Sequence, residues 1–298
     1  MDPNVRERFA EAVRAERPDL AVLCLLICAA ADPEAGEVSP HAGGTPLVVS
    51  PESRVDTIVD AGQIELDRLT GLLPYATGRT PEEWAGALAG LLGEREGFHG
   101  TEADYERLDS SLLGAVLRRR RGLPILLSVV WLEVARRAGA PVHGVGLPGH
   151  FVVGFGDPQG PDHVLADPFA GGRPLSPEDA GALVAGAGFG TGGRPPPSLL
   201  VPAEPLDIVQ RILGNIRVWA AARPERVDVR LWAVELSLLL PHHPVRLRHE
   251  RARLLVERGD FLGGARALEE YADLVAAADP DAARSARGEA HAARARLN

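Results

Sequence analysis

Two residues at the ends of neighbouring apolar runs could together activate a nucleophile. In the stretch GVGLPGHFVVGFG, residues 144–156, His150 follows a Pro-Gly turn and opens a run rich in valine and phenylalanine, which is typical of a β-strand. Asp167 ends a second apolar run, in LADPFAGG. An imidazole oriented by a carboxylate can take a proton from a nucleophile near neutral pH. His150 and Asp167 are therefore candidates for the base and the orienting residue of a catalytic triad.

The third member of such a triad has three candidates, Ser128, Cys24 and Cys28. A nucleophile must approach the imidazole to about 2.6–3.2 Å. Ser128 lies inside a predicted helix, where a serine hydroxyl more often bonds the carbonyl of the preceding turn. The two cysteines lie in an apolar run, where a free thiol usually behaves as a small buried hydrophobe. A structural pairing of His150 with Asp167 is therefore favoured over catalysis.

The same region offers donor atoms for a metal ion. His143, His150, His163 and Asp167 lie on adjacent predicted strands, and three imidazoles with one carboxylate suit zinc. Alternation along the strands favours opposite faces for His143 and His150, and neither an HExxH nor a CxxC spacing occurs. We therefore predict no metal and no other cofactor. The chain has no lysine, which excludes a Schiff-base lysine and a P-loop lysine.

Composition and charge argue against several classes of function. The formal net charge of −9 argues against a nucleic-acid partner, and the basic run Arg118–Arg121 directly precedes Gly122, where cations favour the C-terminus of a helix. The most apolar run, Leu20–Ala31, is well short of the about 20 residues that a membrane span needs. The first residues are charged, unlike a signal peptide, and two cysteines make no disulfide framework. These features predict a cytoplasmic protein that binds neither nucleic acid nor membranes.

The first two thirds of the chain are predicted to form helices followed by strands. Periodicity and breakers predict helices at residues 4–15, 20–31, 55–73 and from 81 onward. Asp19 and Thr80 are the expected caps, and a surface loop is expected over 33–53. A further helix should begin at Pro124 and end before Gly139, and its largely apolar sequence predicts burial. Strand-like runs occupy residues 141–147, 150–156 and 163–169. The expected core is an α+β fold in which an antiparallel sheet packs on the buried helix.

The last third of the chain is predicted to be all helical. Residues 189–205 are rich in glycine and proline, as in a linker. Helices are expected to begin at Leu206, Val227, Val245, Asp260 and Asp281. The segment from Arg251 to Pro280 resembles a tetratricopeptide unit with its inter-helix turn at residues 259–261, and stacked helical hairpins form concave surfaces that bind peptides. The predicted organisation is a domain at 1–188, a linker at 189–205 and a region of helical hairpins at 206–298.

The central block of the chain resembles a known family. Its sequence GFHGTEADYERLDSSLLGAVLRRRRGLPILLSVVWLEVARRAGAPVHGVGLPGHFVVGF, followed by DPFAGG, is similar to the SirB-type transglutaminase-like family of bacterial proteins. The resemblance implies a papain-like, transglutaminase-like core followed by tetratricopeptide-like helices. The family tends to have asparagine where this chain has Thr101, Ser110 and Gly114.

Transglutaminase-like enzymes use a Cys-His-Asp arrangement in which the cysteine begins the buried helix. His150 and Asp167 match the second and third positions, but residues 122–125, where the cysteine is expected, read GLPI and contain no nucleophile. Asp104, Tyr105 and Ser111 also match the family, and their side chains either fold over the pocket or cap the next helix. The resemblance therefore implies a triad that lacks its nucleophile.

These observations lead to two alternative functions. The residues expected to line a pocket beside His150 are Pro124, Tyr105, Gly149, Phe151 and Phe169. We predict a non-catalytic binding or regulatory protein whose unknown peptide or protein partner binds through the C-terminal helices. The alternative is an amide-directed hydrolase or acyltransferase in which His150 is the base, Asp167 orients it, and Ser128 or a displaced cysteine attacks. The absent cysteine favours the binding protein.

Overall fold

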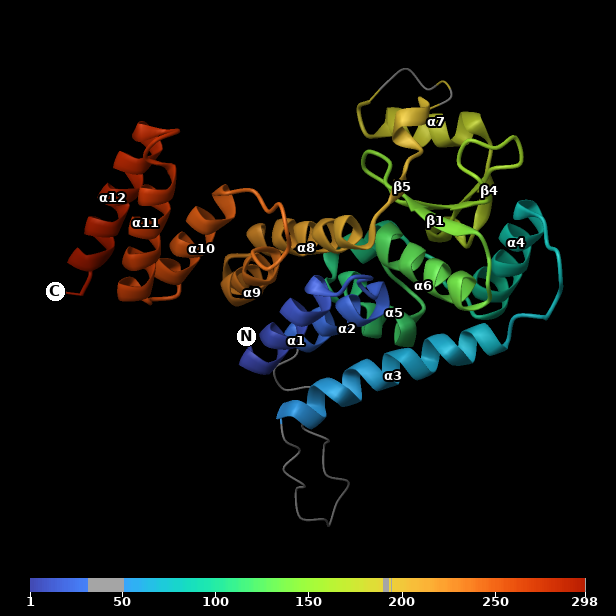
Figure 1. Ribbon diagram of the computed structural model, residues 1–298, viewed down its shortest axis with the longest axis horizontal. Coiled ribbons are helices and arrows are strands. Elements are labelled where there is room, and N and C mark those ends of the chain that lie inside the picture. Colours follow the sequence, from blue (N-terminus) through green and yellow to red (C-terminus); the bar gives the residue numbers. More distant parts are fainter. Residues whose placement is uncertain (32–50, 190–192, 194, 298) are drawn as a thin grey trace, which may run out of the picture.

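The computed structural model describes residues 1–31, 51–189, 193 and 195–297, without the side chains of residues 51–53. The predicted loop at 33–53 lies almost entirely outside these residues. Figure 1 shows an elongated molecule, with a sheet and its covering helices at one end and the last three helices at the other. The predicted α+β class is confirmed, because one antiparallel sheet is combined with many helices and an all-helical C-terminal region.

The N-terminal helices begin and end close to their predicted positions. Their bounds are Pro3–Arg14 (α1), Leu20–Ala31 (α2), Pro51–Gly71 (α3) and Pro81–Leu88 (α4). The expected caps are present, since Asp19 Oδ1 accepts the Val22 N–H at 2.9 Å and Thr80 forms a reciprocal capping box with Glu83. A π-helical segment, Ala89–Arg95, continues α4, and such an irregularity leaves no mark in hydrophobic periodicity.

The next two helices occupy the centre of the core. The bounds are Glu102–Glu106 and Leu108–Ser111 for two 3₁₀ turns, Leu113–Arg119 for α5 and Pro124–Arg137 for α6. The α5 helix ends where Arg120 adopts a left-handed φ of 59°. The Arg120 guanidinium also pairs with Glu65 at 2.6 Å, so the basic run makes a tertiary contact as well as ending a helix. Nearly every residue of α6 before Arg136 is buried, which confirms the predicted buried helix.

Five short strands form one sheet with the order β4-β3-β2-β1-β5, and all neighbours are antiparallel. Their bounds are Val142–Val145 (β1), Val152–Phe155 (β2), Val164–Asp167 (β3), Arg173–Leu175 (β4) and Pro202–Ala203 (β5). The first three strands form the predicted meander. The sequence does not predict β4 and β5, because they are very short and each contains a proline.

Different helices cover the two faces of the sheet (Figure 1). Val153 and Phe155 belong to the same buried cluster as α6, whereas Val152 packs with Ala180 of α7, Pro177–Gly186. Successive residues of β2 therefore alternate between the two covering layers. Because both faces are covered, the ends of β2 and β3 are held in place by core packing.

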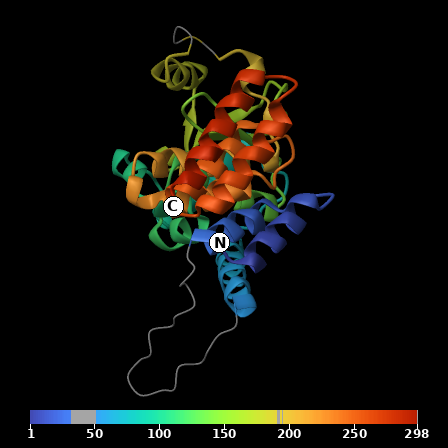
Figure 2. The same cartoon turned by 90° about the vertical axis from the view of Figure 1, so that its left-hand side faces the viewer.

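The C-terminal helices pack as consecutive neighbours. Their bounds are Pro205–Ala221 (α8), Val227–Ser237 (α9), Arg246–Glu257 (α10), Phe261–Val275 (α11) and Pro280–Ala295 (α12). Buried residues of α8 and α9, such as Ile212 and Trp232, join the main core, while α11 and α12 build a separate alanine-rich core with α10. Figure 2 shows these last three helices stacked side by side. The predicted linker contains β5, and the predicted division at 188 and 205 stays a prediction.

Candidate functional site

The ends of β2 and β3 bring His150 and Asp167 together. The two strands are antiparallel neighbours, with Val153 opposite Ala166, so His150, two residues before β2, lies at the same end of the sheet as Asp167, the last residue of β3. His150 Nε2 and Asp167 Oδ1 are 3.0 Å apart, and the two side chains are only 11% and 8% exposed. Because a carboxylate oxygen accepts, Nε2 carries the proton of this bond. Nδ1 of the ring has no partner among the described residues and is the atom available to a ligand.

Two further groups hold the imidazole in this orientation. The Phe169 ring meets the His150 ring edge-on, at 5.9 Å between centroids, and Asp167 Oδ1 accepts the Phe169 N–H at 3.0 Å. Arg211 of α8 donates to the Leu147 and His150 carbonyls at 2.7 and 2.6 Å, which fixes the turn before β2. The imidazole is therefore positioned by the sheet on one side and by the C-terminal helices on the other.

A cavity of about 450 Å³ opens beside His150. It is lined by Tyr105, Ser111, Leu123, Pro124, Ile125, Gly149, His150, Phe151, Arg211, Asn215, Val218 and Trp219. Four of the five predicted lining residues are among them. The fifth, Phe169, is not, because its ring packs between His150 and Tyr105 instead. Gly149 permits the turn at this wall, since its φ of +69° is a conformation that residues with a Cβ rarely adopt.

The first turn of α6, where the family resemblance places a nucleophilic cysteine, forms one wall of the cavity. Leu123, Pro124 and Ile125 occupy it, and none of their side chains can attack a carbonyl. Pro124 is the first residue of the helix, and the preceding Leu123 supplies no side-chain cap. This wall is therefore apolar, and it faces an oriented His-Asp pair.

Ser128 does not line the cavity. Its side chain is fully buried, and its hydroxyl donates to the Phe151 carbonyl at 3.2 Å. That bond ties the second turn of α6 to the start of β2. The hydroxyl bonds neither the preceding turn of its own helix nor His150, so the structure gives Ser128 a role in holding the wall.

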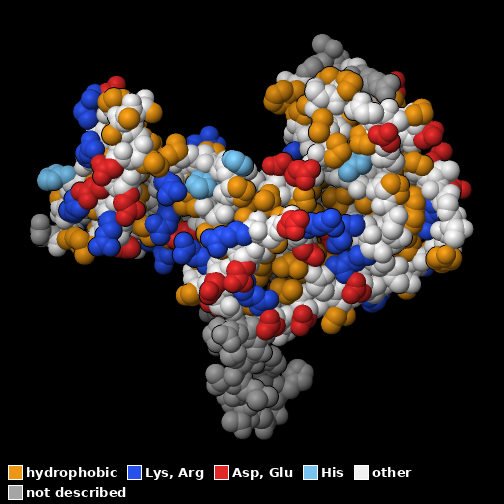
Figure 3. All heavy atoms as spheres, viewed as in Figure 1, with side chains coloured by type: hydrophobic (Ala, Val, Ile, Leu, Met, Phe, Trp, Pro, Cys, Tyr) orange, Lys and Arg blue, Asp and Glu red, His pale blue; other side chains and the backbone are white. Residues whose placement is uncertain are grey.

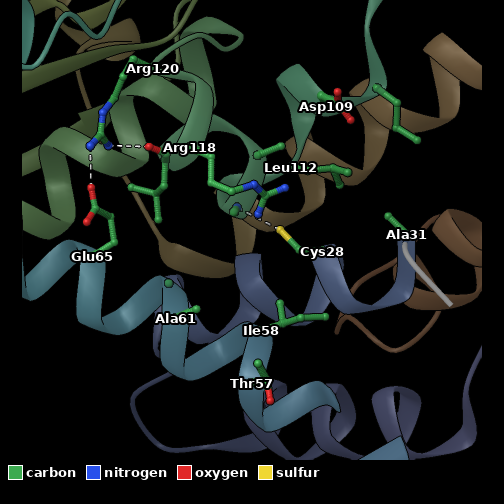
Figure 4. A pocket seen from close by; sticks show the side chains of 15 residues that line it. Cys28, Ala31, Thr57, Ile58, Ala61, Glu65, Asp109, Leu112, Arg118 and Arg120 are labelled. Atoms are coloured by element: carbon green, nitrogen blue, oxygen red, sulfur yellow. Dashed lines mark hydrogen bonds and ion pairs between the residues drawn. The ribbon is translucent and has the colours of Figure 1, made fainter. Parts of the chain in front are cut away.

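The two cysteines lie elsewhere, and their thiols are held in the protonated form. Burial raises the pKa of the Cys28 thiol to about 11, and burial raises the pKa of Cys24 as well. Figure 4 shows Cys28 at the edge of a separate cavity, of about 820 Å³, between α2, α3 and α5. Its Sγ accepts the Gly114 N–H at 3.2 Å. This cavity shares no lining residue with the one beside His150.

We expect both cysteines to react slowly with iodoacetamide in the folded protein. A thiol with a pKa near 11 is almost entirely protonated at neutral pH, and only the thiolate is nucleophilic. Labelling followed by mass spectrometry should be about 100-fold faster in concentrated urea than in native buffer. In native buffer, a His150→Ala variant should be labelled at the same rate as the wild-type protein. Fast native labelling that disappears in this variant would contradict the prediction and identify a thiolate activated by His150.

The four candidate zinc ligands separate into two pairs. His143 and His163 reach across Gly154, with their Nε2 atoms 3.2 Å apart, while His150 pairs with Asp167. Burial lowers the pKa of His143 to about 4 and lowers that of His163, so both rings are neutral at pH 7. Among the residues that the structure describes, no three His, Cys, Asp or Glu side chains form a metal-binding group. The alternation expected from the strands explains the separation.

Sequence reasoning missed the contribution of α8 to this site. Arg211, Asn215, Val218 and Trp219 line the cavity from a helix that follows the predicted core. No local motif marks them, because they are ordinary residues of an amphipathic helix. Ser111 was noted only as a family match, and its hydroxyl lines the cavity without a hydrogen-bond partner among the described residues.

Among solved structures, the chain is partly similar to menin. That crystal structure of menin reveals the binding site for the Mixed Lineage Leukemia (MLL) protein. The match covers 90% of this chain and 68% of menin, with a TM-score of 0.40 and 13% sequence identity. In the described part of the chain, no helix has the length and apolar character needed to cross a membrane.

Sequence relatives are found in bacteria and in mammals. A UPF0162 protein of Xylella fastidiosa is 35% identical over 187 residues, which cover 61% of this chain and 64% of that protein. A UPF0162 protein of Pseudomonas aeruginosa is 37% identical over 116 residues, 39% of this chain and 41% of that one. F-box only protein 21 of Homo sapiens is 28% identical over 174 residues, 54% and 26% respectively. The chain thus spans less than two thirds of the length of each of these relatives.

Family comparison agrees with the fold. The model described as the transglutaminase-like superfamily matches residues 53–214, more than half of the chain, and the model described as a tetratricopeptide repeat matches residues 216–298. The UPF0162 relatives are of the SirB type, so the predicted resemblance is confirmed. The chain belongs to the transglutaminase-like superfamily and carries a tetratricopeptide-like region after the matching domain.

Proposed function

We propose that this protein is a non-catalytic binding and regulatory member of the superfamily, with the cavity beside His150 as its ligand pocket. One observation carries the proposal: the oriented His150–Asp167 pair faces a helix start that reads Leu123-Pro124-Ile125. A base without a nucleophile can still bind a ligand, because Nδ1 offers a hydrogen bond. The two free cysteines support a cytoplasmic location, where thiols stay reduced.

The polar groups around the cavity support recognition of a polar ligand. Tyr105, Ser111 and Asn215 make no side-chain hydrogen bond with any described residue, and Trp219 Nε1 is buried without such a partner. Burial, together with the charge of Asp167, raises the pKa of Tyr105, so its phenol keeps its proton and can donate. A largely apolar pocket with a few unsatisfied donors and acceptors is typical of a ligand site. The tetratricopeptide-like helices next to it suit a peptide or protein partner.

The alternative, an amide-directed hydrolase or acyltransferase, rests on one specific observation. The Ser111 hydroxyl lines the cavity that also contains His150. In that reaction the serine oxygen would attack an amide carbonyl while His150 Nδ1 takes the hydroxyl proton, and the amine would leave with that proton. Water or a second amine would then release the acyl group.

The experiment that separates the two functions measures turnover in matched variants. Dansylcadaverine incorporation into dimethylcasein and peptide release from casein are followed for the wild-type protein and for His150→Ala. The binding proposal expects both proteins to stay at the background rate. A wild-type rate above background that falls about 100-fold or more in both His150→Ala and Ser111→Ala would establish the enzyme instead. Circular dichroism checks that each variant is folded.

A further inference from the structure

The surface is hollowed over α8, between the part that contains the sheet and the last three helices (Figure 3). The cavity beside His150 lies on this helix. A second cavity, of about 380 Å³, lies between α8 and the start of α10, and a third, of about 740 Å³, lies among α10, α11 and α12. Three cavities therefore follow one another from the His150 pocket to the end of the chain.

Two arginines connect these cavities. Arg211 lines both the cavity beside His150 and the second cavity, and Arg246 lines both the second cavity and the third. Each of these arginines therefore belongs to the walls of two neighbouring cavities. A ligand that extends from the His150 pocket along α8 has to pass both side chains.

Neither arginine has a carboxylate partner among the described residues. Arg211 donates only to the Leu147 and His150 carbonyls and lies over the Phe151 ring. Arg246 is exposed and forms no ion pair or side-chain hydrogen bond in the described part of the chain. Most other charges in these walls are neutralised locally: Glu250, for example, pairs with both Arg217 and Arg230.

The walls of the three cavities are more basic than the rest of the molecule. Their arginines are Arg211, Arg217, Arg230, Arg246, Arg253 and Arg296, and their carboxylates are Asp207, Glu250, Glu257 and Glu289. Arginine is thus in excess here, while the whole chain has a net charge of −9. Charge complementarity predicts an acidic occupant.

The length of the hollow favours an extended segment over a small anion. From Asp207 to Trp219, α8 advances about 18 Å at 1.5 Å per residue, and an extended peptide covers that distance with about five or six residues. The path continues past Arg246 into the third cavity. A segment of about ten residues can therefore reach from the His150 pocket to the last helices.

We propose that an acidic, extended peptide segment of a partner protein binds along α8, held by Arg211 and Arg246, with one end in the cavity beside His150. This inference rests on the proposed binding function and names its class of partner. The carboxylates of the segment pair with these two guanidinium groups, neither of which has a carboxylate partner among the described residues, and its apolar side chains enter the cavities between them. A peptide in which the carboxylates become amides keeps the same shape but loses these contacts.

The test uses fluorescence anisotropy of the full chain with two synthetic probes. The first is fluorescein-labelled (Ser-Glu-Leu-Glu) repeated three times, and the second has glutamine in place of each glutamate. We expect the acidic probe to bind at least 10-fold more tightly. Arg246→Gln should weaken this binding about 5- to 10-fold, because one charge-assisted contact is lost. The matched control Arg248→Gln removes the same charge from α10, at an exposed residue that lines none of the three cavities, and should change binding less than 2-fold.

A third variant reports on the other end of the path. Val218→Glu adds a negative charge at an exposed residue of the His150 cavity, and it should weaken the acidic probe at least 5-fold. An effect of only one of Arg246→Gln and Val218→Glu would overturn the continuous path. Equal effects of Arg246→Gln and Arg248→Gln would overturn the role of Arg246. Binding of an oligothymidine that is tighter than binding of the acidic peptide would overturn the peptide as the occupant in favour of a nucleic acid. Cleavage of the bound probe, seen by mass spectrometry, would overturn the proposed non-catalytic function while leaving the path intact.

Discussion

Replacing Asp167 by alanine is expected to lower the free energy of unfolding by about 2–4 kcal/mol. Asp167 Oδ1 accepts hydrogen bonds from both His150 Nε2 and the Phe169 N–H, and both side chains of the His-Asp pair are largely buried. The substitution leaves two buried donors without an acceptor, and it also weakens the link between β3 and the start of β2. Urea unfolding followed by circular dichroism measures the loss.

Two further variants test whether the loss comes from these hydrogen bonds. Asp167→Asn keeps an acceptor oxygen at the same place and should cost only about 1 kcal/mol. Asp162→Ala removes a carboxylate from the other end of β3, where the side chain is exposed and makes no ion pair with a described residue, so its effect should stay within about 0.5 kcal/mol. If Asp167→Ala and Asp162→Ala lost the same amount, the pair would contribute nothing to stability.

Replacing Trp131 by alanine is expected to cost about 3–5 kcal/mol. The ring is fully buried in α6, meets Phe98 edge-on at 6.2 Å between centroids, and lies against Gly172. Removing it leaves a cavity behind the loop that follows Asp167. The same unfolding experiment measures the loss, and the His150 side of the site should loosen with it.

A Trp131→Phe variant tests the packing of the ring separately from the buried indole N–H. The indole Nε1 of Trp131 is buried without a hydrogen-bond partner among the described residues, so its removal offsets part of the lost packing. Trp131→Phe should therefore cost no more than about 1.5 kcal/mol. Val218→Ala, at a residue that is 74% exposed, should change stability by less than about 0.5 kcal/mol. A loss in Trp131→Phe as large as in Trp131→Ala would contradict this account.

The pairing of His150 with Asp167 could be anticipated because both residues lie at the ends of consecutive strands. In an antiparallel meander, the start of one strand and the end of the next lie at the same end of the sheet. Two local sequence patterns therefore place the two side chains close together. The apolar start of α6 could be anticipated as well, since Pro124 marks the first turn and its neighbours Leu123 and Ile125 are apolar.

The partners that complete the site could not be anticipated in this way. Arg211 donates to the carbonyl of His150 from 61 residues further along the chain, and Ser128 donates to the Phe151 carbonyl from a helix 23 residues before it. Such contacts depend on how helices dock on the sheet. Helical periodicity shows which face of α8 is apolar, but not which loop its polar residues meet.

By itself, the sequence determined most of the helices, but not α7 or the π-helical segment, as well as the three-strand meander and the positions of His150 and Asp167. These features follow from caps, breakers and alternation, which act over a few residues. Only the tertiary structure decided that α8 lines the cavity beside His150 and that His143 pairs with His163. It also decided that Arg211 and Arg246 each line two neighbouring cavities. These are contacts between segments far apart in the chain, and packing of the whole core selects them.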